Sequence, residues 1–194
     1  SCSCEIMRLD CYYFDQGGKP FEERTKVNYD SPEIFDFDEM LADIRLLLDG
    51  KPVTRKGYNY AEHRWDDSEE LMYPPEVLII EGIHVFYDDR ICDIMNLKLF
   101  IKVDSDICLL RRIARDMNER GRSLESISEQ YKATVKPMRE KYIDKYIDKA
   151  DVVVMRGGMN EQALKTTISY LKSCVKEQRP AESEKNESDG NDSE

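Results

Sequence analysis

Four short apolar runs, separated by segments of helical periodicity, constrain the fold of this chain more than any other feature. They cover residues 5–9, 77–80, 97–103 and 152–155, and they have the length of buried strands. Strands that alternate with helices are typical of βαβ units, in which helices cover both faces of a mostly parallel sheet. The sequence therefore predicts an α/β fold with three layers.

Apolar residues recur at spacings of three and four between the strands. The clearest such segment is 37–48, and Gly50 follows where a helix would stop. Helical periods also mark residues 107–114, 124–135 and 164–171, and Pro137 is expected to kink or interrupt the helix before it. Residues 51–73 lack this period and alternate Tyr58 with Tyr60, which predicts a small β-hairpin that leaves the sheet.

Length and charge indicate one domain with a polar tail. A chain of 194 residues that is 40% apolar is long enough for a single core, and its net charge of −11 argues against a general nucleic-acid surface. Residues 179–194 carry six acidic and two basic side chains and no aromatic or branched aliphatic residue. Such a segment has nothing to bury that would offset its ordering entropy. We therefore expect one domain at residues 1–178 and a disordered acidic tail at 179–194.

The cysteines and the hydropathy pattern favour a protein of the cytoplasm. Six cysteines show no C-x-x-C spacing, and the single C-x-C at Cys2 and Cys4 is a weak metal signal in a chain with two histidines. No apolar run approaches the roughly 20 residues of a membrane span, and no secretory signal opens the sequence. Reduced thiols are expected in such a protein.

A cluster of arginines interrupts this acidic chain. Residues 111–122 contain five of them, in the order R-R-x-x-R-D-x-x-x-R-G-R, and Gly121 precedes the last. Guanidinium groups this close repel one another unless an anion lies among them, and phosphate oxygens match their planar fork. A phosphate-rich ligand is one interpretation. The alternative is a solvated helix on which these arginines pair with Asp116 and Glu119.

Two acidic residues follow predicted strands. Asp10 ends the first run, and Glu81 directly follows the four aliphatic residues 77–80. Ligands of parallel α/β proteins gather at the carboxyl ends of the strands. Glu81 resembles a Walker-B carboxylate, which holds Mg²⁺, although it is also suited to cap the following helix. Since a second carboxylate suits a general base, these acids and the arginine cluster together indicate phosphoryl transfer to a hydroxyl group.

The phosphate-binding motif expected for such chemistry is absent from the 194 residues. A P-loop kinase carries G-x-x-x-x-G-K-[ST] after its first strand. Here G-G-K at residues 17–19 is followed by proline, and R-G-G at 156–158 has no lysine. The second stretch predicts a tight strand-to-helix turn, with Asn160 as the helix cap. Because the chain begins with Ser1 rather than Met, we expect the strand and loop that carry the motif to lie upstream.

Several segments, in order, resemble the uridine kinase (uridine/cytidine kinase) family over almost all of residues 5–172. They are L-D-C-Y-Y, N-Y-D-S-P-E, Y-N-Y-A-E-H, I-I-E-G-I, D-I-C-L-L-R-R-I-A-R-D-M-N-E-R-G-R-S-L-E-S, Q-Y-K-A-T-V-K-P-M and A-D-V-V-V-M-R-G-G-x-N. The long arginine segment, with Q-Y and K-P-M at family spacing, is the most specific. The resemblance implies a P-loop kinase fold, phosphorylation of the 5′-hydroxyl of uridine or cytidine with ATP and Mg²⁺ in pyrimidine salvage, and a homo-oligomer, often a tetramer.

The resemblance also implies roles for individual residues. Asp10 matches the catalytic aspartate that accepts the hydroxyl proton, and Asp10 and Glu81 match the acids around magnesium. Positions that match nucleoside contacts are Tyr13, Tyr29, Asp30, Tyr58, Tyr60, His63, Arg112, Arg122 and Gln130. Arg115 and Arg120 match arginines of a lid, at about 111–124, over the ATP phosphates. His84 matches no family ligand and is expected to be structural.

Simpler interpretations of the hairpin stay open, and the chain departs from the family pattern in places. His63 also fits a surface histidine, and Tyr58 and Tyr60 also fit ordinary cross-strand pairs. Residues 102–103 replace the family's Asp-Thr, the arginine of His-x-Arg is shifted by one position at 63–65, and Pro-x-Lys is missing at 145–147.

Two other functions also stay open. One is a non-catalytic relative that binds nucleoside, or assembles with active subunits, after losing its ATP loop. The other is a kinase like phosphoribulokinase with a different acceptor, against which the tyrosine and histidine residues of the hairpin argue.

Overall fold

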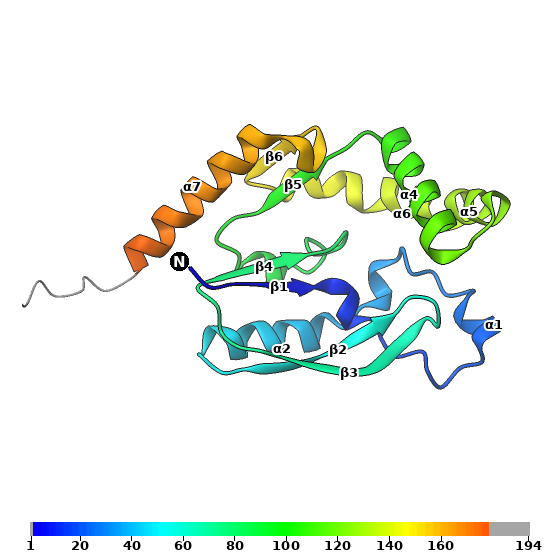
Figure 1. Ribbon diagram of the computed structural model, residues 1–194, viewed down its shortest axis with the longest axis horizontal. Coiled ribbons are helices and arrows are strands. Elements are labelled where there is room, and N and C mark those ends of the chain that lie inside the picture. Colours follow the sequence, from blue (N-terminus) through cyan, green and yellow to red (C-terminus); the bar gives the residue numbers. More distant parts are fainter. Residues whose placement is uncertain (1, 179–194) are drawn as a thin grey trace, which may run out of the picture.

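The computed structural model describes residues 2–178, which form three two-stranded sheets and seven α-helices (Figure 1). The strands are β1 (Cys4–Arg8), β2 (Val53–Asn59), β3 (Arg64–Met72), β4 (Val77–Glu81), β5 (Leu99–Lys102) and β6 (Val152–Met155). The helices are α1 (Phe21–Arg24), α2 (Phe37–Leu48), α3 (Asp89–Cys92), α4 (Ser105–Arg120), α5 (Leu124–Gln130), α6 (Lys136–Lys141) and α7 (Glu161–Gln178). The expected tail at 179–194 lies outside the described residues.

Two of the sheets are parallel strand pairs, which confirms the α/β class. In the β1–β4 pair Arg8 lies opposite Glu81, and in the β5–β6 pair Leu99 lies opposite Val152. Parallel partners need a long crossover, and here helices and the hairpin supply it. The expectation of one sheet is corrected: within residues 2–178 the two parallel pairs do not hydrogen-bond to each other. In the view of Figure 1, β5 lies above β4.

Helix α2 builds the main core, as its periodicity predicts. The Asp36 carboxylate caps the helix by accepting a hydrogen bond from the Glu39 N–H at 2.9 Å, and Gly50, with φ of 78°, lies just beyond its end. Its buried residues pack with side chains of β1, the following turn and both hairpin strands; they are Phe37, Met40, Leu41, Ile44 and Leu47. Each fully buried aliphatic side chain contributes about 1.5–3 kcal/mol.

The predicted hairpin is the antiparallel pair β2–β3. Tyr58 lies opposite Trp65, and the register shifts between Lys56 and Tyr58, which marks a β-bulge. Gly57 lies in this bulge, next to the ends of the Asp66 and Ser68 side chains. The hairpin turn that follows carries His63 with φ of 50°.

The arginine cluster begins on α4 and ends beyond it. Gly121, with φ of 60°, closes the helix. The helical path of α5 then continues through a π turn (Tyr131–Val135) into α6, where Pro137 occupies the first turn. Proline has no N–H to donate to the preceding turn, and the wider π turn lies where that bond would be missing. The expected interruption is thus a local change from α-helical to π-helical geometry, and the helix does not end there.

A second, smaller core forms around Phe86, Cys92 and Tyr146. Lys149 donates hydrogen bonds to the Phe86 carbonyl at 2.7 Å and to Asp89 at 2.6 Å, which holds the 3₁₀ segment Ile143–Lys149 against it. The segment that lacks the family's Pro-x-Lys is therefore well packed.

The chain enters its last helix through the predicted tight turn. Arg156 and Gly157 have φ of 67° and 66°, and the Asn160 side chain accepts a hydrogen bond from the Ala163 N–H at 3.2 Å. Asn160 therefore caps α7 as predicted. None of the helices in residues 2–178 combines the length and the apolar character needed to cross a bilayer.

Candidate active site

Asp10 and Glu81 lie at the same edge of the β1–β4 pair. Glu81 is the last residue of β4 and pairs with Arg8, and Asp10 follows Arg8 by two residues in the turn Leu9–Tyr12. Partial burial raises the pKa of Glu81, the charge of Asp10 raises it further, and Arg8 at 3.6 Å opposes the shift. The predicted meeting of two carboxylates at the carboxyl ends of parallel strands is confirmed as geometry.

The hairpin reaches this edge through Tyr60. Its hydroxyl donates a hydrogen bond to Asp10 Oδ2 at 2.8 Å. Burial and the nearby charge of Asp10 raise the pKa of Tyr60, so the phenol keeps the proton that it donates. On its other side, the guanidinium of Arg120 lies 5.1 Å from the centre of the Tyr60 ring. Tyr60 therefore connects the carboxylate edge to the arginine cluster.

A further carboxylate, that of Asp30, is held by side chains of the helical segment. The Thr134 hydroxyl donates to Asp30 Oδ2 at 3.1 Å, and Arg112 Nη1 lies 3.6 Å from Oδ1. Asp30 itself is 9% exposed. A partly buried carboxylate with spare acceptor positions can accept hydrogen bonds from a vicinal diol.

Aromatic side chains form a stack between the hairpin and the chain after β1. His63 stacks on Tyr29 with ring centres 4.9 Å apart, and Tyr13 contacts the rings of both Tyr29 and Tyr58 at 5.5 and 4.7 Å. The buried hydroxyls of Tyr29 and Tyr58 make no hydrogen bond of normal geometry. Burial lowers the pKa of His63, and Arg122 and Arg24 lower it further, which favours a neutral imidazole. Flat aromatic faces with polar groups at their edges suit a heterocyclic base.

The arginine cluster surrounds one buried carboxylate, that of Asp116, which has no exposed surface. Four of its five members approach this carboxylate: Arg115 at 2.9 Å, Arg120 and Arg122 at 3.5 Å, and Arg112 at 3.7 Å. The alternative pairing is thus correct for Asp116, whereas Glu119 makes no ion pair within residues 2–178. One carboxylate cannot neutralise four guanidinium groups, so the cluster keeps excess positive charge and still suits phosphate.

Gln130 connects the arginine cluster to Asp30. Its side-chain oxygen accepts hydrogen bonds from Arg122 at 2.5 Å and from Arg112 at 3.1 Å, and Arg112 in turn faces Asp30. The nucleoside contacts implied by the resemblance therefore lie in two groups, one around Asp30 and one in the aromatic stack, which Tyr60 joins through Tyr58. Their roles stay predictions.

Comparison with known proteins decides the family. A family model described as "Phosphoribulokinase / Uridine kinase family" matches residues 5–163. The chain is 41% identical to the uridine kinase of Ligilactobacillus salivarius over 171 residues, which is 88% of this chain and 80% of that protein. It is 43% identical to the uridine kinase of Streptococcus gordonii over 174 residues, 90% and 83% of the two chains. The chain belongs to the phosphoribulokinase/uridine kinase family.

This kinase also shares its fold with a solved member of the family. Phosphoribulokinase from Rhodobacter spheroides superposes with a TM-score of 0.61 at 13% sequence identity, over 79% of this chain and 60% of that one. At this identity the likeness bears on the fold alone. The predicted P-loop kinase-like fold and the predicted reaction class, phosphoryl transfer by a kinase, are both confirmed at the level of the family.

The residues at the strand edge fit a magnesium ion. Mg²⁺ prefers oxygen ligands, keeps several waters and is held in kinases by one or two carboxylates together with the phosphates of the substrate. Asp10 and Glu81 offer two carboxylates at one edge, and burial together with the charge of Asp10 raises the pKa of Glu81. The ion pair with Arg8 is exposed and weak enough to be exchanged.

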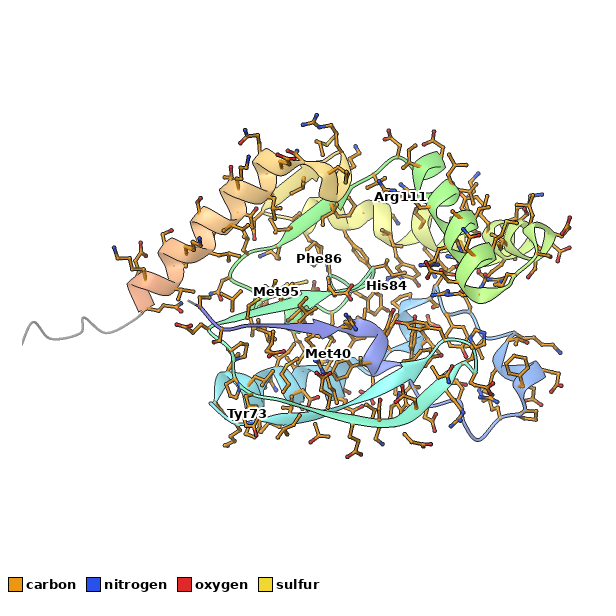
Figure 2. All side chains as sticks on the ribbon, viewed as in Figure 1. Met40, Tyr73, His84, Phe86, Met95 and Arg111 are labelled. Atoms are coloured by element: carbon orange, nitrogen blue, oxygen red, sulfur yellow. The ribbon has the colours of Figure 1, made fainter. Side chains whose placement is uncertain are left out.

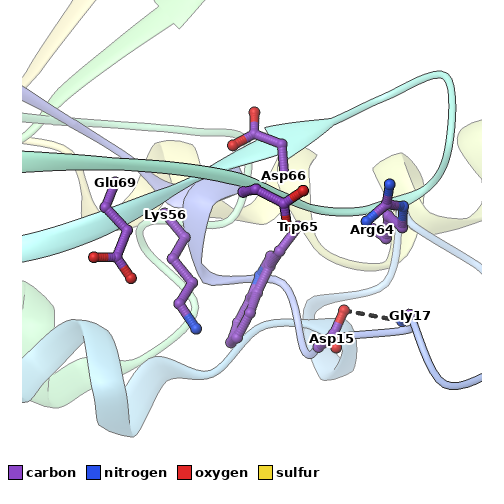
Figure 3. A pocket seen from close by; sticks show the side chains of 8 residues that line it. Asp15, Gly17, Lys56, Arg64, Trp65, Asp66 and Glu69 are labelled. Atoms are coloured by element: carbon purple, nitrogen blue, oxygen red, sulfur yellow. Dashed lines mark hydrogen bonds between the residues drawn. The ribbon is translucent and has the colours of Figure 1, made fainter.

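The best-defined cavity of this kinase lies elsewhere, beside the hairpin (Figure 3). It has a volume of about 350 Å³ and is lined by Asp15, Gly17, Lys56, Arg64, Trp65, Asp66, Asp67 and Glu69. Lys56 Nζ lies 4.5 Å from the centre of the Trp65 ring within it. None of the residues predicted for the site lines this cavity.

Two further residues support the site, and the sequence reasoning missed them. Thr134 follows Gln130 by one helical turn and reaches Asp30, so its spacing was the available signal. Arg24 is 8% exposed and donates a hydrogen bond to the carbonyl of Glu62, next to His63. It fixes the hairpin turn against α1, and nothing in the sequence pattern indicates this contact.

Proposed function

We propose that this kinase transfers a phosphoryl group from ATP to the 5′-hydroxyl of uridine or cytidine, forming UMP or CMP in pyrimidine salvage. The observation that carries the proposal is the meeting of Asp10 and Glu81 at one strand edge, next to a hairpin that contacts the arginine cluster. The names of the relatives support a nucleoside acceptor.

Asp10 is the general base in this proposal. It accepts the proton of the 5′-hydroxyl as the oxygen attacks the phosphorus, and Tyr60 keeps the carboxylate oriented. Asp10 and Glu81 would hold Mg²⁺, which supplies neutralisation of the phosphate charge when it is bound. Arg115 and Arg120 add positive charge over the ATP phosphates, where it stabilises the transferring group.

The nucleoside is bound by the two groups around Asp30 and the aromatic stack. Asp30 accepts hydrogen bonds from the ribose 2′- and 3′-hydroxyls, with Arg112, Gln130 and Arg122 beside it. Tyr13, Tyr29 and Tyr60 flank the base, and Tyr58 and His63 read its edge. The hydroxyls of Tyr29 and Tyr58, which interact with each other but not in normal hydrogen-bond geometry, provide polar groups that a base can satisfy.

The proposal extends to the organisation of the protein. Residues 1–178 form the kinase domain, which works in the cytoplasm and assembles with further copies of itself. The six cysteines, all free, are consistent with a reducing compartment. The family resemblance supports self-assembly.

A panel of acceptors tests the proposal. The complete protein is incubated with ATP, Mg²⁺ and either uridine, cytidine, 2′-deoxyuridine or ribulose 5-phosphate, and the products are separated by chromatography. We expect UMP and CMP, and about 10–100-fold lower kcat/KM for 2′-deoxyuridine because it cannot donate one bond to the Asp30 carboxylate. Asp30→Asn serves as the control, and in this variant the kcat/KM values for uridine and 2′-deoxyuridine should lie closer together.

The other outcomes distinguish the alternatives. Turnover of the sugar phosphate without the nucleosides would favour a kinase with another acceptor. Uridine binding without any UMP would favour a non-catalytic relative.

A further inference from the structure

His84 is a fully buried histidine that contacts the backbone of Asp30. It has no exposed surface and lies in the turn after β4, where Figure 2 labels it. Its Nε2 is 2.8 Å from the carbonyl oxygen of Asp30, and its Nδ1 is 2.9 Å from the hydroxyl of Tyr146. Phe35 and Tyr142 pack against the ring at 6.0 and 5.9 Å.

The two partners determine the tautomer of this histidine. A backbone carbonyl can only accept, so Nε2 carries a proton and donates it to Asp30. Burial lowers the pKa of His84, although the Asp30 carbonyl and charge oppose this shift, so the neutral imidazole is favoured. Nδ1 is then an acceptor. Burial also raises the pKa of Tyr146, which keeps its proton and donates it to Nδ1.

These bonds hold the backbone of Asp30, apart from the contacts of its carboxylate. The Asp30 N–H donates to the Asn28 side chain at 3.1 Å, and its carbonyl accepts from His84. The backbone is therefore fixed on both sides of the residue. With Arg112 and Thr134 on the carboxylate, little freedom remains in where the oxygens point.

We infer that His84 and Tyr146 are positioning residues that set the Asp30 carboxylate for the ribose diol. This inference rests on the proposed function of Asp30. A carboxylate that accepts two hydrogen bonds from vicinal hydroxyls needs both oxygens in place, and a small misplacement weakens both bonds. Tyr146 lies in the segment 145–147, where the chain departs from the family pattern.

The test uses two substitutions of His84 that have opposite effects on its hydrogen bonds. His84→Leu removes the donor and the acceptor, whereas His84→Gln keeps an amide donor and a carbonyl acceptor at similar separation. Tyr146→Phe removes the distal hydroxyl alone. Dissociation constants for uridine and for 2′,3′-dideoxyuridine are measured by calorimetry on the complete protein, at a temperature where thermal melts show every variant folded.

We expect His84→Leu to weaken uridine binding about tenfold and dideoxyuridine binding less than twofold. His84→Gln should recover most of the uridine affinity. In an Asp30→Asn background, His84→Leu should cause no further loss of uridine affinity, because both changes act through the Asp30 carboxylate.

Equal weakening of both ligands, or no change in either, would overturn the inference and leave a merely structural histidine. If the unmodified protein binds uridine no tighter than dideoxyuridine, the proposed role of Asp30 fails as well, and the two failures are distinguishable.

Discussion

At the scale of single residues, the most informative one is Asp116. The sequence left open whether the clustered arginines meet a ligand or pair with acids of their own helix. In the folded chain Asp116 is turned inward and four guanidinium groups converge on it. The carboxylate thus brings together cations that would otherwise repel one another, and it orients them towards the hairpin and Asp30.

Replacing Asp116 by Asn keeps the shape of the side chain but removes its charge. We expect the free energy of unfolding, measured by urea denaturation, to fall by about 3 kcal/mol, because four arginines lose their buried counter-charge. The arginines are partly exposed, which sets the loss at the lower end of the range for buried networks. Glu119→Gln, on the same helix but without an ion pair to any of residues 2–178, should change stability by less than about 0.5 kcal/mol. A variant of Asp116 as stable as the unmodified protein would contradict this assignment.

At the scale of elements, helices and strands with a clear period were predictable to within a few residues. Helix α2 has the predicted bounds because its apolar spacing and its stop at Gly50 are local signals. The same holds for β6 and for the cap of α7 at Asn160. The π geometry of the turn before Pro137 was not predictable, since a proline indicates only that one helical hydrogen bond is missing.

The amphipathic character of α2 gives a direct test at this scale. Met40 has no exposed surface, whereas Leu48 on the same helix is 68% exposed. We expect Met40→Ala to lower the free energy of unfolding by about 2–5 kcal/mol through lost burial and a cavity. Leu48→Ala should cost less than about 0.5 kcal/mol. Similar losses in the two variants, measured by chemical denaturation, would show that α2 does not pack on the core through the face described.

Contacts between elements could not be predicted from the sequence. The hydrogen bond from Thr134 to Asp30 joins residues 104 positions apart, and that from His84 to Asp30 joins residues 54 apart. No local pattern contains such pairs. The meeting of Asp10 and Glu81 was predictable, because parallel strands place their carboxyl ends at one edge regardless of the distance along the chain.

At the scale of the whole molecule, three parts of the chain converge on one region. The β1–β4 edge supplies Asp10 and Glu81, the hairpin supplies Tyr60, and the helical segment supplies Arg120. The role proposed for Asp10 as the base for phosphoryl transfer therefore depends on the fold as a unit.

The rate of UMP formation by Asp10→Asn tests that claim most directly. It is measured in the complete protein at saturating uridine, ATP and Mg²⁺, together with the dissociation constant of uridine. We expect the rate to fall by about 10²–10⁴-fold while the dissociation constant stays within about threefold, because Asp10 acts on the reacting hydroxyl and Asp30 holds the ribose. Asp49→Asn, an exposed carboxylate at the end of α2, should leave both unchanged. A variant of Asp10 that forms UMP at nearly the full rate would contradict the account.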